Sequence, residues 1–114
     1  NQNLNNWDVS SVTRMDYMFA GATSFNGNIS SWNTASALNM RSMFQDASAF
    51  NVNIGSWNTG SVTNMYTMFA FAVAFDQDLG NWDVSKVTNC DDFFGGITNW
   101  PESKKPNFTN CNPN

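Results

Sequence analysis

The residues in this chain that could carry out chemistry are nine carboxylates and two cysteines, and the sequence contains no histidine. Without histidine, neither the Ser/His/Asp and Cys/His arrangements of nucleophilic catalysis nor the common zinc ligand sets can be built. The carboxylates are scattered along the chain, and no glycine-rich phosphate loop is present. The pattern therefore predicts a protein that is not an enzyme and that uses no cofactor and no metal.

Four of the carboxylates have a more specific context. Asp76 and Asp78, separated by one residue, weakly resemble the start of a calcium loop. They lack the Asp/Asn-Gly turn and the distant glutamate of an EF-hand, so we favour turn capping over calcium binding. Asp91 and Asp92 lie near an expected helix, whose positive N-terminal end they would stabilise. We therefore expect structural roles for all four.

The two cysteines are Cys90, which lies in the fourth repeat described below, and Cys111, near the C-terminus. Two buried free thiols are one interpretation. We favour a disulfide, because a tail folded back over the last repeat needs an anchor and an oxidising compartment would permit one. Closing such a loop would stabilise the fold by roughly 3 kcal/mol in the chain-entropy model.

Most apolar residues recur every 25 residues, beginning with the tryptophans Trp7, Trp32, Trp57 and Trp82. Columns in the same register are Met15, Met40, Met65 and Cys90; Phe19, Phe44, Phe69 and Phe94; and Phe25, Phe50, Phe75 and Trp100. A fixed period of this length is typical of repeat arrays, in which each unit covers the apolar face of its neighbour. We therefore predict four units, approximately residues 1–25, 26–50, 51–75 and 76–100, followed by a C-terminal capping tail at residues 101–114.

Each unit is expected to contain one short strand and one short helix. Apolar and polar residues alternate from Trp7 to Val9, which is strand periodicity. Apolar residues at 15, 18, 19 and 22 follow the i, i+3, i+4, i+7 spacing of a helix face. Because the period lies within the leucine-rich-repeat range of about 20–29 residues, we predict an α/β repeat solenoid of that type, with parallel strands.

The units FNGNISSWNTASALNMRSMFQDASA and FNVNIGSWNTGSVTNMYTMFAFAVA, and the phrases NWDVSSVTRM and NWDVSKVTNC, carry a family resemblance. They resemble the repeat of BspA-like leucine-rich-repeat surface proteins, and similar repeats occur in mycoplasma lipoproteins. The resemblance covers residues 1 to about 100. It implies a secreted or surface-anchored protein, often with an adhesive role, and no catalytic residues.

Charge is sparse, with five basic residues that form no stripe against nine acidic ones. Nucleic-acid binding requires clustered Lys and Arg, so we do not expect it. No apolar run approaches the roughly 18 residues that span a bilayer. Together with the resemblance, these features predict a non-enzymatic extracellular or cell-surface module for adhesion to, or recognition of, proteins or glycans.

The predicted strands would present one column of small polar side chains on their outward face. Its members are Asp8, Asn33, Asn58 and Asp83. In repeat arrays such a column lines a continuous surface that can bind glycans or a protein backbone. The alternative is a solvated face without a ligand.

The N-terminal end carries no capping segment, so the outer face of the first unit is expected to be bare. That predicted assembly face comprises Leu4, Trp7, Met15, Met18 and Phe19. A second copy whose C-terminal end docked there would make a head-to-tail contact and build a filament. Self-assembly is thus the alternative function, and further repeats of a longer chain are the other way to cover this face.

Two N-glycosylation sequons are present, at Asn28 and at Asn107. A chain this rich in Asn, Ser and Thr produces such sequons by chance, so we treat both as candidates only.

Overall fold

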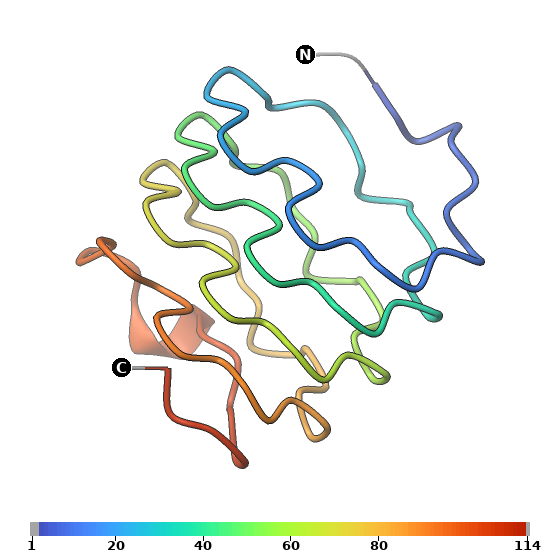
Figure 1. The fold of residues 1–114 in the computed structure, drawn as a ribbon. Helices are drawn as coiled ribbons and strands as arrows, with labels where there is room; N and C mark the ends of the chain where they lie inside the picture. The colour runs from blue at the N-terminus through green and yellow to red at the C-terminus, as the bar shows by residue number, and fades with distance from the viewer. Residues whose placement is uncertain (1–2, 114) are drawn as a thin grey trace.

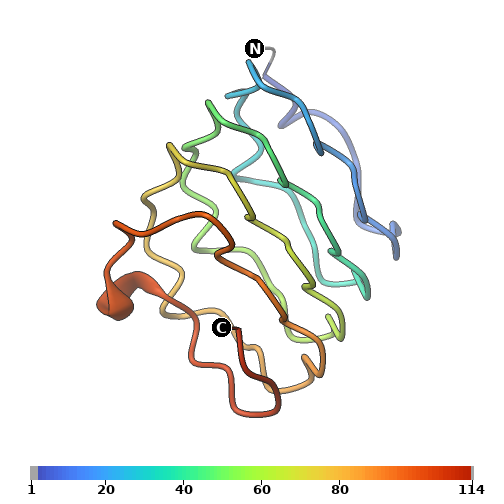
Figure 2. The same ribbon diagram turned by 60° about the vertical axis from the view of Figure 1, so that its left-hand side comes forward.

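The computed structural model describes residues 3–113, and its chain winds through four similar coils that lie side by side (Figure 1). We number the coils in chain order: residues 3–25, 26–50, 51–75 and 76–100. Parallel bridges join Arg14 to Asn39, Asn39 to Asn64, and Asn64 to Asn89, so successive coils keep the 25-residue register. The first and fourth coils form opposite ends of the stack, and the tail lies against the fourth coil (Figure 2).

The predicted α/β solenoid, with one strand and one helix in each unit, is wrong. The only helix in the described residues is η1, a single 3-10 turn at Glu102–Lys104, and the only bridges are the three isolated ones above. The expected role of Asp91 and Asp92 at a helix N-terminus is therefore also wrong, because η1 begins only at Glu102 and no helix of the described residues starts beside them. The coils are built almost wholly from turns.

Backbone hydrogen bonds explain why residues 15–22 do not form the predicted helix. The Met15 N–H donates to the Asn39 carbonyl at 2.8 Å, and the Tyr17 N–H donates to the Arg41 carbonyl at 2.9 Å. The Met18 N–H instead donates within its own coil, to the Met15 carbonyl at 3.3 Å. Donors thus alternate between the next coil and the local turn, whereas a helix would direct every N–H to the residue four positions earlier.

These turns place two residues of each coil at positive φ. The first position holds Tyr17, Ser42, Thr67 and Asp92, with φ between 50° and 62°; the second holds Gly21, Asp46, Phe71 and Gly96, with φ between 60° and 74°. Left-handed backbone costs a non-glycine residue roughly 1–2 kcal/mol. Contacts between the coils must offset that cost six times, since only two of the eight residues are glycines.

The core consists of columns of stacked side chains that run from coil to coil. The Phe44 ring stacks between Phe19 and Phe69, with ring centroids 5.6 and 5.3 Å away. The positions assigned to the helix face do point inward: Met40 and Met43 are fully buried. The apolar spacing therefore identified the buried residues correctly, although the backbone that buries them is not helical.

A second column consists of tryptophans that also donate hydrogen bonds. Trp32 stacks on Trp57 at 6.2 Å, and Trp57 stacks on Trp82 at 6.5 Å. Each indole N–H reaches a carbonyl of the preceding coil: Trp32 donates to Leu4 at 2.8 Å and Trp57 donates to Ile29 at 3.1 Å. Packing and a buried polar bond are thus supplied by the same side chain.

The tail covers the fourth coil, and the predicted disulfide between Cys90 and Cys111 is confirmed. The Phe108 ring packs edge-on against Phe93, with centroids 5.0 Å apart. The Leu79 N–H donates to the carbonyl of Lys104 at 2.8 Å, which attaches η1 to the same coil. No helix in residues 3–113 has the length and apolar character that crossing a membrane requires.

Candidate functional site

A polar groove runs across the second, third and fourth coils. It has a volume of about 670 Å³ and is lined by Ser30, Ser31, Asn53, Gly55, Ser56, Asp78 and Asn81. Every lining residue is exposed or half-buried, and none has a large apolar side chain. The groove therefore presents hydroxyl, amide and carboxylate groups to solvent.

Side-chain-capped turns shape this groove. The Oδ1 atom of Asn53 accepts the Gly55 N–H at 3.0 Å, and Oδ1 of Asp78 accepts the Gly80 N–H at 2.8 Å. The expected turn-capping role of Asp78 is confirmed, while Asp76 bonds to the Lys104 ammonium at 3.1 Å. A Cβ atom on Gly55 would lie 2.6 Å from the Asp78 carbonyl oxygen. Glycine is required there because two coils approach closely.

A column of hydroxyl and amide side chains runs along the groove and forms no hydrogen bonds within the described residues. Ser31, Ser56 and Asn81 occupy the same position of successive coils and are exposed. Their side chains make no hydrogen bond within the described residues, in contrast to the capping Asn and Asp side chains. This column is thus free to bond to a ligand.

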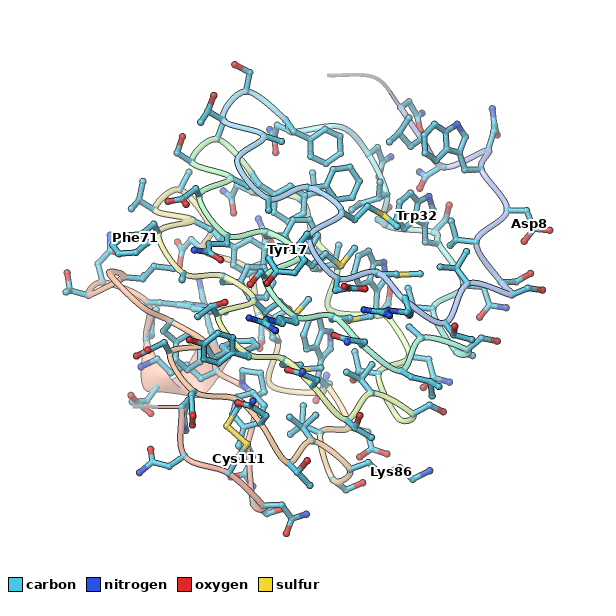
Figure 3. All side chains as sticks on the ribbon, in the orientation of Figure 1. Asp8, Tyr17, Trp32, Phe71, Lys86 and Cys111 are labelled. Carbon is cyan, nitrogen blue, oxygen red and sulfur yellow. A yellow bond between two sulfur atoms is a disulfide. The ribbon has the colours of Figure 1, made fainter. Side chains whose placement is uncertain are left out.

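The predicted binding column lies beside the groove and does not line it. Asp8, Asn33, Asn58 and Asp83 are all exposed, and each side chain caps a turn. Their Oδ1 atoms accept the backbone N–H two residues later, at 3.0, 3.1, 2.9 and 3.0 Å respectively. Figure 3 shows Asp8 pointing away from the coils. One acceptor atom of each residue is therefore committed to the fold.

Serine hydroxyl groups lower the pKa of the two aspartates in that column. The Ser10 hydroxyl and then the Ser10 N–H, both bonded to the carboxylate, lower the pKa of Asp8. The Ser85 hydroxyl and N–H lower the pKa of Asp83 in the same way. Both carboxylates are thus held in the charged form at neutral pH.

A Tyr–Arg–Tyr stack on another part of the surface was missed by the sequence analysis. The Arg41 guanidinium carbon lies 5.5 Å from the centre of the Tyr17 ring and 5.2 Å from that of Tyr66. These residues are 24 and 25 positions apart, so three coils contribute one residue each. The repeat register alone contained the signal, because it places residues 41 and 66 in one column and residue 17 beside it.

The predicted assembly face is smaller than expected. Trp7 and Met18 are exposed, at 59% and 38%, and Phe19 is half-buried. Leu4 and Met15 are buried, at 8% and 0%, so they are not available for contact. Trp7 stacks on Trp32 at 6.5 Å with its other face uncovered.

Both candidate glycosylation residues, Asn28 and Asn107, are exposed. The Oδ1 atom of Asn28 accepts the Ser30 N–H at 3.1 Å and the Ser30 hydroxyl at 2.7 Å, so this sequon is also a capped turn.

Comparison with known proteins gives one finding about ancestry. No curated protein and no solved structure matches the chain. The sequence profile of a family described as "Mycoplasma protein of unknown function, DUF285" matches residues 1–106. This match agrees with the mycoplasma part of the resemblance drawn from the repeat, and it does not assign the chain to the leucine-rich repeats. The chain belongs to the DUF285 family of mycoplasma proteins.

Proposed function

We propose that this chain is a non-enzymatic module of a surface protein and that it recognises a glycan in the polar groove. The observation that carries the proposal is the column Ser31, Ser56 and Asn81, whose exposed polar groups have no internal partner. Neighbouring backbones in a parallel arrangement lie roughly 5 Å apart. Three hydroxyl or amide groups at this spacing suit an elongated ligand that carries hydroxyl groups along its length. The bonds from these three neutral side chains to such a ligand would involve no charge.

The surface location is part of the same proposal. The disulfide between Cys90 and Cys111 supports it, because disulfides persist in oxidising compartments outside the cytosol. Proteolysis of intact cells that produce the protein tests the location: removal of the protein without cell lysis is expected, and full protection would contradict it.

Binding of the purified chain to a glycan array tests the groove, with the triple variant Ser31→Ala, Ser56→Ala, Asn81→Ala beside the wild type. We expect the wild type to bind saturably. The affinity of the triple variant should be lower by at least about tenfold, which corresponds to 1.4 kcal/mol.

The matched control for this experiment is the variant Ser11→Ala, Ser61→Ala, Asn99→Ala, which makes the same chemical changes outside the groove. Its binding should equal that of the wild type. The proposal is wrong if no glycan binds, or if the groove variant binds as well as the control variant.

A second candidate function is end-to-end self-assembly, which the uncovered face of Trp7 favours. Trp32, Trp57 and Trp82 each donate an indole N–H to the coil before them, whereas Trp7 makes no such bond within the described residues. At this end of the stack a row of carbonyls accepts no hydrogen bond from the described residues, namely those of Arg14, Asp16, Met18 and Ala20.

The opposite end of the stack carries a complementary row of backbone N–H donors. In the part of the chain that the structure describes, four such groups donate no hydrogen bond, namely those of Cys90, Asp92, Phe94 and Gly96. A second copy is the occupant that this pattern favours, because acceptors then meet donors in the register used between coils. The tail covers the apolar side of the fourth coil, through Phe108 and Cys111, and would have to shift.

Light scattering on the wild type and Trp7→Asp tests assembly. Val73→Asp is the matched control, because Val73 is 55% exposed and does not lie on the assembly face. We expect particles that grow with concentration and that only Trp7→Asp reduces to monomers. A monomeric wild type, or equal effects of both substitutions, would exclude this candidate.

A further inference from the structure

The Tyr–Arg–Tyr stack holds a cation in a fixed orientation on the surface. The Arg41 guanidinium lies between the rings of Tyr17 and Tyr66, which are exposed and half-buried. Two flanking rings attract the cation and restrict its rotation, so the edge of the guanidinium, which carries the N–H groups, remains free. The Tyr17 side chain is 48% exposed. A planar fork of donors is thereby pre-oriented toward solvent.

Asp16, which occupies the position of Arg41 in the preceding coil, is engaged elsewhere. Asp16 accepts two hydrogen bonds from the Arg14 side chain, at 3.2 and 2.9 Å. The Arg14 bond is the main reason that the pKa of Asp16 is lowered, and Arg41 adds a smaller Coulombic contribution. Arg41 itself forms no ion pair and donates no side-chain hydrogen bond within residues 3–113.

A small pocket beside the stack is rich in donors. It has a volume of about 160 Å³ and is lined by Arg41, Asn64, Tyr66 and Asn89. Oδ1 of Asn64 accepts the Tyr66 N–H at 2.9 Å, and Oδ1 of Asn89 accepts the Asp91 N–H at 3.3 Å. Because the turns occupy the amide oxygens, each amide leaves its NH₂ group, which is a donor only. No carboxylate lines the pocket.

We propose that this pocket binds a carboxylate, with the two acid oxygens on the Arg41 guanidinium edge and further bonds from the amides of Asn64 and Asn89. Guanidinium and carboxylate pair bidentately, and such charge-assisted bonds are stronger than neutral ones. The group on the ligand is either the acid of a uronic sugar or the C-terminus of a peptide. The pocket shares no lining residue with the polar groove, so the inference stands apart from the proposed function.

Titration of the ¹⁵N-labelled chain, followed by amide NMR shifts, tests the proposal with four probes. Glucuronate is compared with glucose, and acetyl-diglycine is compared with its C-terminal amide. We expect a saturable response of the Arg41 region to at least one acid and none to the neutral partner. The acid that binds more tightly identifies the source of the carboxylate.

Variants separate recognition from stability. Arg41→Gln is expected to weaken acid binding by at least about tenfold, whereas Lys86→Gln, which removes an exposed cation outside the pocket, should leave it unchanged. Asn89→Asp keeps the oxygen that caps the turn but introduces a negative charge, so it should also weaken binding about tenfold.

The control for Asn89→Asp is Asn3→Asp, since the Asn3 Oδ1 also caps a turn, at the Asn5 N–H. Binding by this variant should equal that of the wild type. The inference is overturned if neither acid gives a saturable response, if neutral probes bind equally, or if Arg41→Gln binds like the wild type.

Discussion

Removing the disulfide should weaken the fold without abolishing it. The bond joins Cys90 in the fourth coil to Cys111 in the tail, with a sequence separation of 21. Cys90 is completely buried, and a buried thiol packs like a small apolar side chain. The double variant Cys90→Ala, Cys111→Ala therefore tests mainly the cross-link, since neither alanine leaves an unpaired polar group behind.

The expected loss follows from the length of the closed loop. In the chain-entropy model, a loop of this length restricts the unfolded state by roughly 3 kcal/mol. Domains of this size are stable by about 5–15 kcal/mol, so the variant should still fold. The tail also keeps its contact between Phe108 and Phe93 and the bond from the Leu79 N–H to Lys104. Local attachment should therefore persist after the cross-link is removed.

Urea unfolding of the oxidised wild type, the reduced wild type and the double alanine variant measures this loss. The reduced protein and the variant should both lose about 3 kcal/mol of unfolding free energy. In a thermal melt, the same loss would lower the midpoint temperature by roughly 10 °C. The reductant should have no effect on the variant, which is the internal control. A loss below about 1 kcal/mol would refute the view that the bond acts by restricting the unfolded chain.

Two further predictions concern backbone and charge. Gly21→Ala should cost about 1 kcal/mol in urea unfolding, because φ is +72° and nothing lies within 4 Å of the new Cβ. Gly96→Ala should cost more, because its Cβ would lie 2.4 Å from the Phe71 ring; adding Phe71→Ala should reduce the extra cost, and equal losses for both glycines would contradict this. Ser10→Ala should raise the pKa of Asp8 toward the ordinary aspartate value of 3.8, as measured by carboxyl NMR titration, and an unchanged pKa would contradict the assigned cause. Because folding lowers this pKa, the stabilisation is present above pH 3.8 and is lost as the pH falls through the folded value, and Ser10→Ala should diminish that acid loss.

The repeat predicted which residues are buried but not the backbone that buries them. Met40, Met43 and Phe44 recur at helix spacing, and all three are fully buried. A run of turns can present the same positions to the core as a helix does, so apolar spacing alone could not distinguish them. The deciding feature is positive φ at residues such as Thr67 and Phe71, where a β-branched and an aromatic residue give no warning of a left-handed backbone.

The candidate sites were likewise predictable from the sequence only in part. The predicted column at Asp8, Asn33, Asn58 and Asp83 is exposed as expected, but its oxygens cap turns that the sequence analysis treated as strands. The stack of Tyr17, Arg41 and Tyr66 escaped notice because its members belong to three different coils. Only the lateral spacing of coils brings such residues within a few ångströms of each other.

The sequence by itself determined the 25-residue register and the inward columns of Trp, Met and Phe, and it favoured a disulfide between Cys90 and Cys111, which the structure contains. These follow from the types and intervals of residues, because hydrophobic burial depends on composition and period more than on backbone shape. The tertiary structure alone decided the conformation of each coil. Whether the Met15 N–H bonds within its turn or to Asn39 depends on the presence of a neighbouring coil, and that contact is non-local.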